Sequence, residues 1–508
     1  MTEPYRPNIR WLFDWGNDGQ FDHPLSDVSG DVLIYNLRWG TAADTPQIAK
    51  VTPDSEDVQI VGGILPDTAQ GAIQIYDRDG RFDPDNPGLQ VSESILRSPI
   101  GVRLLHNSRI LWQGIGLPNY GVAVRPTTFF EWQLQGKFYG EAAGRLDLIS
   151  SPGSLHNIED DEVSLTLTST RDLPLGLVRF NGARIKMYEL IGRMIGGWVY
   201  ENERGDFRLI TMQDAFAASA PNMLDPSFEP YDGAIIKELT SLVTTRATYT
   251  SQAWSPVVDT QTKQLREVSV GTEQYRLFAG ATTFTWRMRP GDPRRIDTWL
   301  EPQVIGDARI IVRSSSTRDR SITFTVLAAS SGDYSVSLRA HISEIATVAE
   351  RDYINESVEA VYGKRDLGLP PWYSANLVDA EAITGAWLDN LSEPLEWFRI
   401  TYPEWQTSVA KHQQLLDTKP GSVSNFVVST QQKALRPVKG LVLAVRLQGG
   451  HRQIPTRTVY GVGVRIRPPV PLLAASATVL SPYRIQANVR LEQSDPSKTI
   501  YVDIEKET

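Results

Sequence analysis

The sequence predicts a mainly β fold with a minor α part. Residues 1–150 alternate apolar and polar side chains in segments such as GAIQIYD and FFEWQLQG. Turn residues separate these segments, which is typical of an antiparallel barrel or sandwich. Residues 251–350 show the same alternation in SITFTVLAASS and YSVSLRAHI and predict a β-sandwich. Helical spacing occurs in two short segments, KMYELIGRM and DAEAITGAWLDNL.

Between these strand-rich regions, residues 151–235 predict a helix that ends at a Gly-Gly pair and is followed by a hairpin with its turn at Asn202–Asp206. The apolar side chains that share one face of this helix are Leu190, Ile191, Met194 and Ile195. Residues 236–250 predict a single strand that returns to a barrel. In the second helix, residues 379–392, the apolar face consists of Ile383, Trp387, Leu388 and Leu391. PPVP at 468–471 predicts a stiff linker before a small β module or an arm.

Length and composition limit the possible functions. A chain of 508 residues exceeds one ordinary core and predicts three or four domains. It contains no cysteine, which excludes disulfides, thiolate metal sites and cysteine nucleophiles. The net charge is −9 and the basic residues are scattered, so no basic stripe is available to hold nucleic acid. MTEPYRPNIRWLF lacks the apolar core of a signal peptide, and no apolar run is long enough to span a membrane.

The most informative segment is AIQIYDRDGRFDPDNPGL, residues 72–89, in which a strand runs into an Asp-, Gly- and Pro-rich loop. We expect Phe82, the one large apolar residue of the loop, to be buried and Gly80 to adopt a positive φ. Acidic side chains of the loop are expected to cap turn backbone. The structural positions of this loop are Asp77, Asp79, Gly80, Phe82, Asn86 and Pro87. Two strands around a polar His106–Arg109 turn are predicted to follow.

This loop, followed by a hairpin that ends in a Leu-Trp-x-Gly strand, resembles the N-terminal barrel of tail-tip and baseplate hub proteins of tailed bacteriophages. Residues 12–40 resemble the start of the same family's chains. A third similarity lies in ESVEAVYGKRDLGLPPW, residues 356–372, with Val361 as an extra residue in the spacing. The matched hub-family positions are Ser357, Tyr362, Gly363, Arg365 and Leu367.

The resemblance implies two β-barrel hub domains, a small α+β segment and an inserted β-sandwich. The expected division is residues 1–150 for the N-terminal hub barrel, 151–235 for the helix and hairpin, 236–250 with 351–467 for a discontinuous second barrel, 251–350 for the insert, and 468–508 for a C-terminal linker and β module or arm.

The resemblance also implies a structural role without catalysis or cofactor. Three copies would form a ring that ends the tail tube, adapts sixfold to threefold symmetry and lines the DNA channel. The implied partners are the distal tail ring and tail tube proteins, the tape-measure protein, tail fibre or spike proteins, and phage DNA in transit. The chain would be made in the bacterial host cytoplasm and located at the tail tip of the virion.

Sequence patterns that would indicate a metal site, a hydrolase or an adhesin are weaker. The six histidines have no metal-motif spacing, so surface or turn positions are expected for all of them. Asp14, Asn17 and Asp18 begin like a calcium loop, but its twelfth position is Leu25 rather than glutamate. An ordinary Asp/Gly turn is favoured there, with calcium as the alternative. A cell-wall or capsule hydrolase would need an acid pair in a cleft of the insert, and a carbohydrate-binding adhesin would need Trp286 and Trp299 to line a groove.

Overall fold

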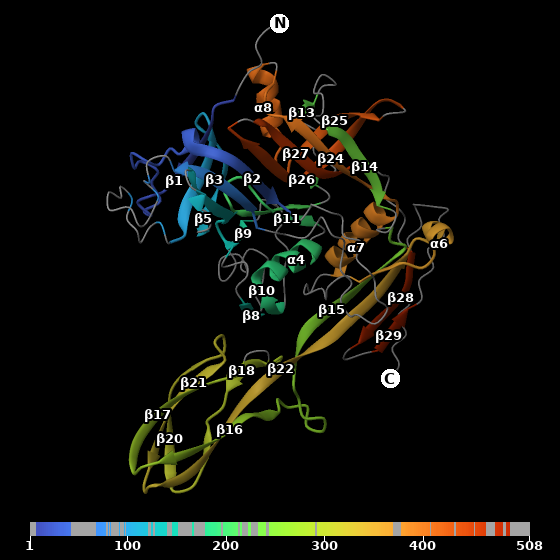
Figure 1. The fold of residues 1–508 in the computed structure, drawn as a ribbon. Helices are drawn as coiled ribbons and strands as arrows, with labels where there is room; N and C mark the ends of the chain where they lie inside the picture. The colour runs from blue at the N-terminus through green and yellow to red at the C-terminus, as the bar shows by residue number, and fades with distance from the viewer. Residues whose placement is uncertain are drawn as a thin grey trace.

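A computed structural model provides the structure of the chain. It describes residues 7–41, 68–77, 80, 82, 91, 96, 98–119, 123–124, 127–139, 145–150, 165–166, 178–194, 197–211, 214–215, 222–224, 232–239, 243–289, 292–368, 377–406, 408–430, 433–451, 453–463, 473–480 and 484–487. The protein is mainly β with a minor α part. Figure 1 shows a β-rich body, helices below it, and a long β arm that extends away from both. Among the described residues, no helix is long and apolar enough to cross a membrane.

The body is built on one curved thirteen-stranded sheet. Its N-terminal half consists of β1 (Ile9–Phe13), β4 (Ile100–His106), β5 (Arg109–Asn119), β7 (Thr127–Gly136) with the short β6 (Ala123–Val124), β3 (Gln70–Asp77) and β2 (Val32–Gly40). Its C-terminal half consists of β26 (Lys433–Gly450), β27 (Gln453–Gly463), β24 (Leu395–Pro403), β14 (Asp232–Leu239), β25 (Val423–Thr430) and β13 (Asn222–Leu224). The hairpin predicted around His106–Arg109 is present as β4 and β5.

The two halves meet where β2 pairs antiparallel with β26. Leu37 lies opposite Leu447, and Trp39 lies opposite Val445. All four side chains belong to a single hydrophobic core that continues into both halves. The resemblance implies two barrels. In the structure the strands of both regions lie in one continuous sheet around a shared core.

Below the sheet lie the helix α4 (Arg184–Met194) and the hairpin of β11 (Gly197–Glu201) and β12 (Phe207–Thr211), as the sequence predicts. Met187, Tyr188 and Ile191 of α4 are buried, and the Tyr188 ring packs on Phe207 with a centroid distance of 4.6 Å. The short β9 (Leu165–Thr166) pairs with β12, and β8 (Arg145–Ser150) pairs with β10 (Val178–Ala183).

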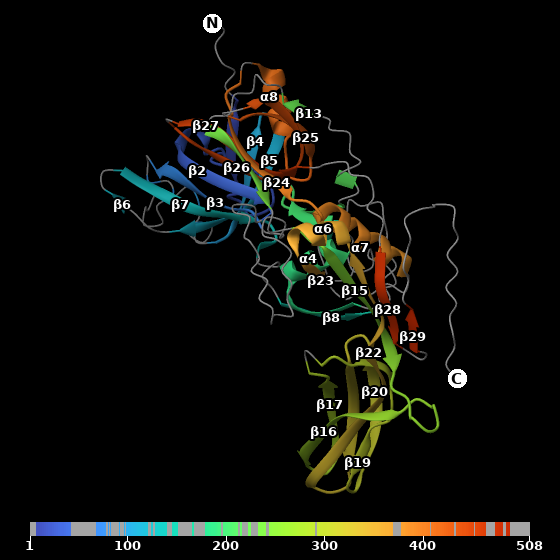
Figure 2. The same ribbon diagram turned by 90° about the vertical axis from the view of Figure 1, so that its right-hand side faces the viewer.

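The arm consists of two long strands and the strands between them. In the first part of the arm, β15 (Arg246–Pro256) pairs with β22 (Gly332–Ile354) from Arg246 opposite Ile354 to Pro256 opposite Ser343. Further out, β22 pairs with β16 (Glu267–Leu277), β18 (Arg295–Trp299) and β19 (Gln303–Ile305). A second sheet of β17 (Gly280–Arg287), β21 (Ser321–Ala328) and β20 (Ala308–Ser316) packs on it around a separate hydrophobic core. Figure 2 shows the arm from the side.

The prediction of one strand over residues 236–250 is wrong. The segment contributes to two strands, β14 and β15, which belong to different sheets. β14 pairs with β24 in the body, whereas β15 begins at Arg246 and pairs with β22 of the arm. The physical reason is that β15 finds its partner about a hundred residues away, and local alternation carries no information about that pairing.

Where the arm meets the body lie two helices and a short strand. The helix α6 (Glu356–Tyr362) follows β22, and β23 (Asp366–Gly368) pairs parallel with β15. The predicted second helix is α7 (Leu377–Leu391), and its expected apolar face of Ile383, Trp387, Leu388 and Leu391 is buried. Near the C-terminus, β28 (Leu473–Leu480) pairs with β22 and with β29 (Arg484–Ala487). The proline-rich linker at 468–471 lies outside the described residues.

Candidate functional site

The matched positions around Ser357 and Tyr362 form the base of the arm, which we call the joint (residues 355–368 with Thr245 and Arg246). Asn355 is the N-cap of α6: its side-chain oxygen accepts hydrogen bonds from the Val358 amide (3.3 Å) and from the Ser357 hydroxyl (2.8 Å). Gly363 ends the helix with φ 76°, and its amide donates to the Glu359 carbonyl. Asn355 and Gly363 therefore set the two ends of this helix, and Ser357 supports the Asn355 cap.

Thr245 ties the end of the joint to the start of the arm. Its buried hydroxyl accepts from the Arg365 amide at 2.8 Å and lies 3.2 Å from the Gly363 carbonyl. The Arg365 guanidinium lies over the Tyr362 ring at 5.6 Å, and Leu367 is buried. All five matched residues thus have structural contacts within one small unit.

Arg246, the first residue of β15, forms a two-pronged ion pair with Glu359 of α6, with distances of 2.7 Å and 2.6 Å. These hydrogen bonds lower the pKa of Glu359 and raise the pKa of Arg246. The planar fork fixes the direction of α6 relative to β15. The contacts of the joint connect the first residues of the arm with the segment that follows its last strand.

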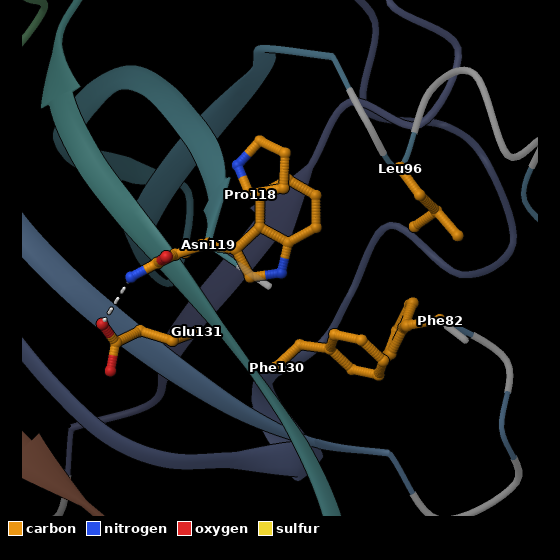
Figure 3. Close-up of a pocket in the computed structure, with 7 residues that line it drawn as sticks. Phe82, Leu96, Pro118, Asn119, Phe130 and Glu131 are labelled. Atoms are coloured by element: carbon orange, nitrogen blue, oxygen red, sulfur yellow. Dashed lines mark hydrogen bonds between the residues drawn. The ribbon is translucent and has the colours of Figure 1, made fainter. Parts of the chain in front are cut away.

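The loop after β3 anchors an aromatic cluster in the N-terminal half. Phe82 is 2% exposed and stacks on Trp15 with a centroid distance of 5.3 Å, and Gly80 has φ 69°. Both the burial and the positive φ were expected. Figure 3 shows Phe82 beside Leu96 and Phe130, and these side chains leave no space for a water molecule. The predicted loop positions Asp79, Asn86 and Pro87 lie outside the described residues.

Asp77 is buried at the end of β3, and its carboxylate lies 3.4 Å from the Phe82 amide. This geometry is weak for a hydrogen bond, but it places the carboxylate against loop backbone, as expected for a turn cap.

Asp14, which begins the possible calcium loop, binds backbone amides of its own turn in the structure. The Asp14 carboxylate accepts hydrogen bonds from the amides of Gly19 (2.8 Å) and Asp18 (3.4 Å), and Asn17 has φ 51°. Its oxygens therefore support the backbone of an Asp/Gly turn. Within the described residues, no group of three or more potential ligands is close enough to hold a metal ion.

All six histidines were expected at surface or turn positions. His106 lies at its predicted turn but is buried, and the expectation is wrong for His412, which is a buried residue of a helix. They are 5% and 1% exposed, and their ring centroids are 4.5 Å apart. His106 ends β4 in the N-terminal half, and His412 lies in α8 (Val409–Asp417), a helix that the sequence did not predict. The physical reason is that α8 packs across the boundary between the halves and covers the end of β4.

His412 belongs to a buried ionic cluster, which we define as His106, Glu404, His412 and Arg457. Glu404 follows β24, and its two carboxylate oxygens lie 2.7 Å from His412 Nε2 and 2.7 Å from Arg457 Nε. Burial alone would raise the pKa of Glu404, but Arg457 and His412 hold it at about 2. Burial and the nearby His412 lower the pKa of His106 to about 4.

The end of α8 is also tied to the N-terminal half. Arg109 of β5 donates to Asp417 (2.8 Å) and to the Leu416 carbonyl (3.2 Å), so a cation lies at the C-terminus of the helix. Leu415 and Leu416 enter the shared core. The helix α8 is therefore a bridge between the halves.

The β11–β12 hairpin provides a second bridge between the halves. Buried Glu201 accepts a hydrogen bond from the Ala69 amide in the N-terminal half. Glu203 pairs with Lys419 of the C-terminal half at 2.6 Å, and Tyr200 lies against Gly421. Sequence analysis found the hairpin but not these contacts, because the residues that meet are far apart in the chain.

Trp286 and Trp299, the residues on which the adhesin alternative depends, contact each other edge to face at 5.9 Å and pack against the core of the arm. The Trp286 indole donates to Glu273 (3.3 Å), and the Trp299 indole donates to the Ser316 carbonyl (3.2 Å). Their contacts are those of packing residues.

Comparison with known protein families and with curated proteins finds no match. Among solved structures, a 43 kDa tail protein of prophage MuSo2 from Shewanella oneidensis aligns with a TM-score of 0.45 at 6% identity, over 90% of this chain and 98% of that one. A tail protein from Neisseria meningitidis MC58 aligns with a TM-score of 0.43 at 8% identity, over 90% and 97%. A prophage tail protein from Listeria monocytogenes EGD-e aligns with a TM-score of 0.38 at 9% identity, over 89% and 94%.

Proposed function

We propose that this chain is a structural hub at the tip of a phage or phage-derived tail. The observation that carries the proposal is the position of the hub-like sequence segments. Residues 12–40 run from the end of β1 through the whole of β2. The segment from residue 72 begins within β3 and leads to the Phe82 anchor, and the segment from residue 356 builds the joint. The resemblance therefore falls on residues that organise the framework.

A trimeric ring is the assembly that this architecture suits. Each chain contributes two β halves that share one sheet and one core, so three chains would present six such units. A ring of this kind would end a sixfold tube and offer a threefold base to a fibre or spike. Head-to-tail association gives a closed ring with a repeated interface when the rotation between neighbouring chains closes.

In this proposal the ring surrounds the DNA channel, and the partners are the tail tube and distal tail ring proteins on one side and fibre or spike proteins on the other. The tape-measure protein would end at the ring. A net charge of −9 suits a wall along which DNA slides, because a lysine-rich wall would bind phosphates through counterion release.

Native mass spectrometry of the full chain, combined with low-resolution imaging of the assembled tail, tests the proposal. We expect three chains per particle, located on the tail axis at its tip. A chain that stays monomeric in complete tails, or that lies away from the axis, would refute the hub function.

No specific observation favours the two alternatives. The tryptophans that an adhesin would need are packing residues of the arm. Two acidic side chains of the arm are engaged with basic ones: Asp292 pairs with Arg294 at 2.6 Å, and Glu267 pairs with Arg339.

A further inference from the structure

The arm contains a short stretch of only two paired strands, which we call the neck (residues 252–255 of β15 with 344–347 of β22). On the body side of the neck, β28 pairs with β22 from Ala349 onward. On the outer side, β18 pairs with β22 as far as Ser343. Between these limits no third strand of the described residues pairs with either β15 or β22. Figure 1 and Figure 2 both show this narrow connection.

The hydrophobic core is interrupted at the neck. All eight of its residues are half-buried or exposed. By contrast, Tyr249 and Ala349 on the body side are each 1% exposed. On the outer side, Ile342 is also 1% exposed and belongs to the separate core of the arm. Packing of side chains stabilises a sheet, and a two-stranded ribbon alone is only marginally stable. The neck is therefore the part of the arm that resists bending least.

The ladder is also irregular at the body end of the neck. Ser251 lies opposite Ala349, whereas Gln252 lies opposite Thr347, so Val348 is an extra residue of β22. A bulge of this kind bends its strand and interrupts the ladder locally. Weak packing and irregular pairing therefore coincide in the same few residues.

Both ends of the neck are held by polar contacts. On the body side, Arg351 of β22 pairs with Glu381 of α7, and the joint ties the first residue of β15 to α6. On the outer side, the Ser343 hydroxyl donates to Asp297 of β18 at 2.5 Å. Deformation of the arm is thus confined to the neck, because the parts on either side are cross-linked to their neighbours.

We propose that the neck is a hinge, about which the outer arm (β16–β21 with residues 332–343 of β22) swings as one rigid body relative to the joint. At about 3.3 Å per residue, residues 332–343 extend about 36 Å, so a bend of about 20° moves their far end by about 12 Å. Phe278 and Ile305, which are 84% and 72% exposed, lie at that end. The hinge varies the position of these apolar side chains while the base of the arm stays in place. This inference concerns a single chain and does not depend on the hub function.

Pulsed electron–electron double resonance between spin labels on the full chain tests the hinge, and the absence of native cysteine makes labelling specific. Figure 1 and Figure 2 both show α4 on the side of the body that faces the outer arm. Lys186→Cys labels α4, where the Lys186 side chain is 55% exposed, and Thr317→Cys labels the exposed turn between β20 and β21. The two labels lie on opposite sides of the neck, so a swing of the outer arm changes the distance between them.

The control pair is Thr317→Cys with Phe278→Cys, because both positions belong to the outer arm. If the outer arm moves as one body, these two labels keep a fixed separation. We expect the distance distribution between Lys186→Cys and Thr317→Cys to be at least about twofold wider than that of the control pair.

Two pairs of glycine substitutions separate a hinge from general softness of the ladder. Ala253→Gly with Ala346→Gly changes a pair within the neck. Thr272→Gly with Ser337→Gly changes a pair of the outer arm, where β22 has a partner strand on each edge. Because glycine adds backbone freedom, the first pair should widen the distribution across the neck further, and the second pair should leave it unchanged.

Three results would overturn the hinge. One is a distribution across the neck that is as narrow as that of the control pair in the parent chain. Another is a control distribution as broad as the one across the neck, since the outer arm would then not move as one body. The third is equal widening by the two glycine pairs, because the flexibility would then not be specific to the neck.

Discussion

Glu404 and Arg457 form an ion pair that is almost completely removed from solvent: the carboxylate Oε1 lies 2.7 Å from Nε, and the residues are 0% and 1% exposed. One partner follows β24 and the other lies in β27, two strands that pair in the C-terminal half. The Glu404 amide also donates to the Pro455 carbonyl at 2.7 Å. Side chain and backbone therefore hold the same two segments together.

Replacing Arg457 by methionine should leave the buried Glu404 carboxylate charged but without its guanidinium partner, because methionine has a long side chain with no charge. We expect a loss of about 3–5 kcal/mol in the free energy of unfolding, measured by urea denaturation. The double variant Glu404→Gln with Arg457→Met should recover part of this loss. Arg10→Met is the control, because it removes an exposed pair with Asp27 and should cost about 1 kcal/mol or less. Equal losses in Arg457→Met and Arg10→Met would contradict the prediction.

The stability of the folded chain should fall in two steps as the pH decreases. The pKa of His106 is about 4 in the folded state, whereas its ordinary value is 6.5. As the pH falls from 6.5 to 4, the unfolded chain binds the proton before the folded chain does. The free energy of unfolding should therefore decrease by about 1–3 kcal/mol over this range. The pKa of Glu404 is held at about 2, so its contribution is complete above the ordinary value of 4.5 and is lost as the pH falls toward 2.

Urea denaturation at a series of pH values between 7.5 and 3 measures the upper step and the beginning of the lower one. The variant His106→Phe should flatten the upper step and leave the lower one, whereas His451→Gln should change neither. A profile that is flat from pH 7 to 4.5 in the parent chain would show that His106 does not resist protonation.

The Phe82 anchor should contribute to stability far more than its place in a polar loop suggests. Phe82→Ala removes a ring that stacks on Trp15 and should cost about 3–5 kcal/mol. The matched control is Phe278→Ala, since Phe278 is 84% exposed and its truncation should change the free energy of unfolding by about 0.5 kcal/mol or less. If the Phe82→Ala variant unfolds at the same urea concentration as the parent chain, Phe82 does not anchor the loop.

Sequence patterns predicted those parts of the fold in which the pattern is local. The β4–β5 and β11–β12 hairpins and the buried face of α7 each follow from neighbouring residues. The helix α8 was missed because its buried positions are His412, Leu415 and Leu416, at helical spacing but with a histidine where an apolar residue is expected. The histidine is buried because Glu404 and His106 lie beside it, and a single sequence does not reveal contacts between segments that are about three hundred residues apart.

Gly421 should tolerate no side chain, because a side chain there would collide with Tyr200. This steric cost can be measured separately from the cost of the positive φ. The φ of Gly421 is 80°, and a Cβ there would lie 2.1 Å from the Tyr200 ring. Gly19 has φ 83° with no atom near its Cβ position, so Gly19→Ala measures the backbone penalty alone, about 1–2 kcal/mol. Gly421→Ala should cost clearly more in urea denaturation and should increase amide exchange in the β11–β12 hairpin. Equal costs for the two variants would show that Tyr200 moves away freely.

The register of the arm allows it to be removed without disturbing its base. Pro256 of β15 lies opposite Ser343 of β22, so deleting residues 257–342 and joining these two by Asn-Gly should close a two-residue hairpin. Because the joint and the β22–β28 pairing lie on the body side of this cut, the body should keep its unfolding temperature within a few degrees. Native mass spectrometry should find the same number of chains per particle as for the full chain.

A deletion of residues 258–342, with the same Asn-Gly closure, provides the matched control. The extra residue either lengthens the turn to three residues or shifts the ladder by one position, so this variant should unfold at a lower temperature than the in-register deletion. If the in-register deletion instead abolishes assembly while the body remains folded, then the arm takes part in the contacts between chains, and its role is not confined to partners outside the ring.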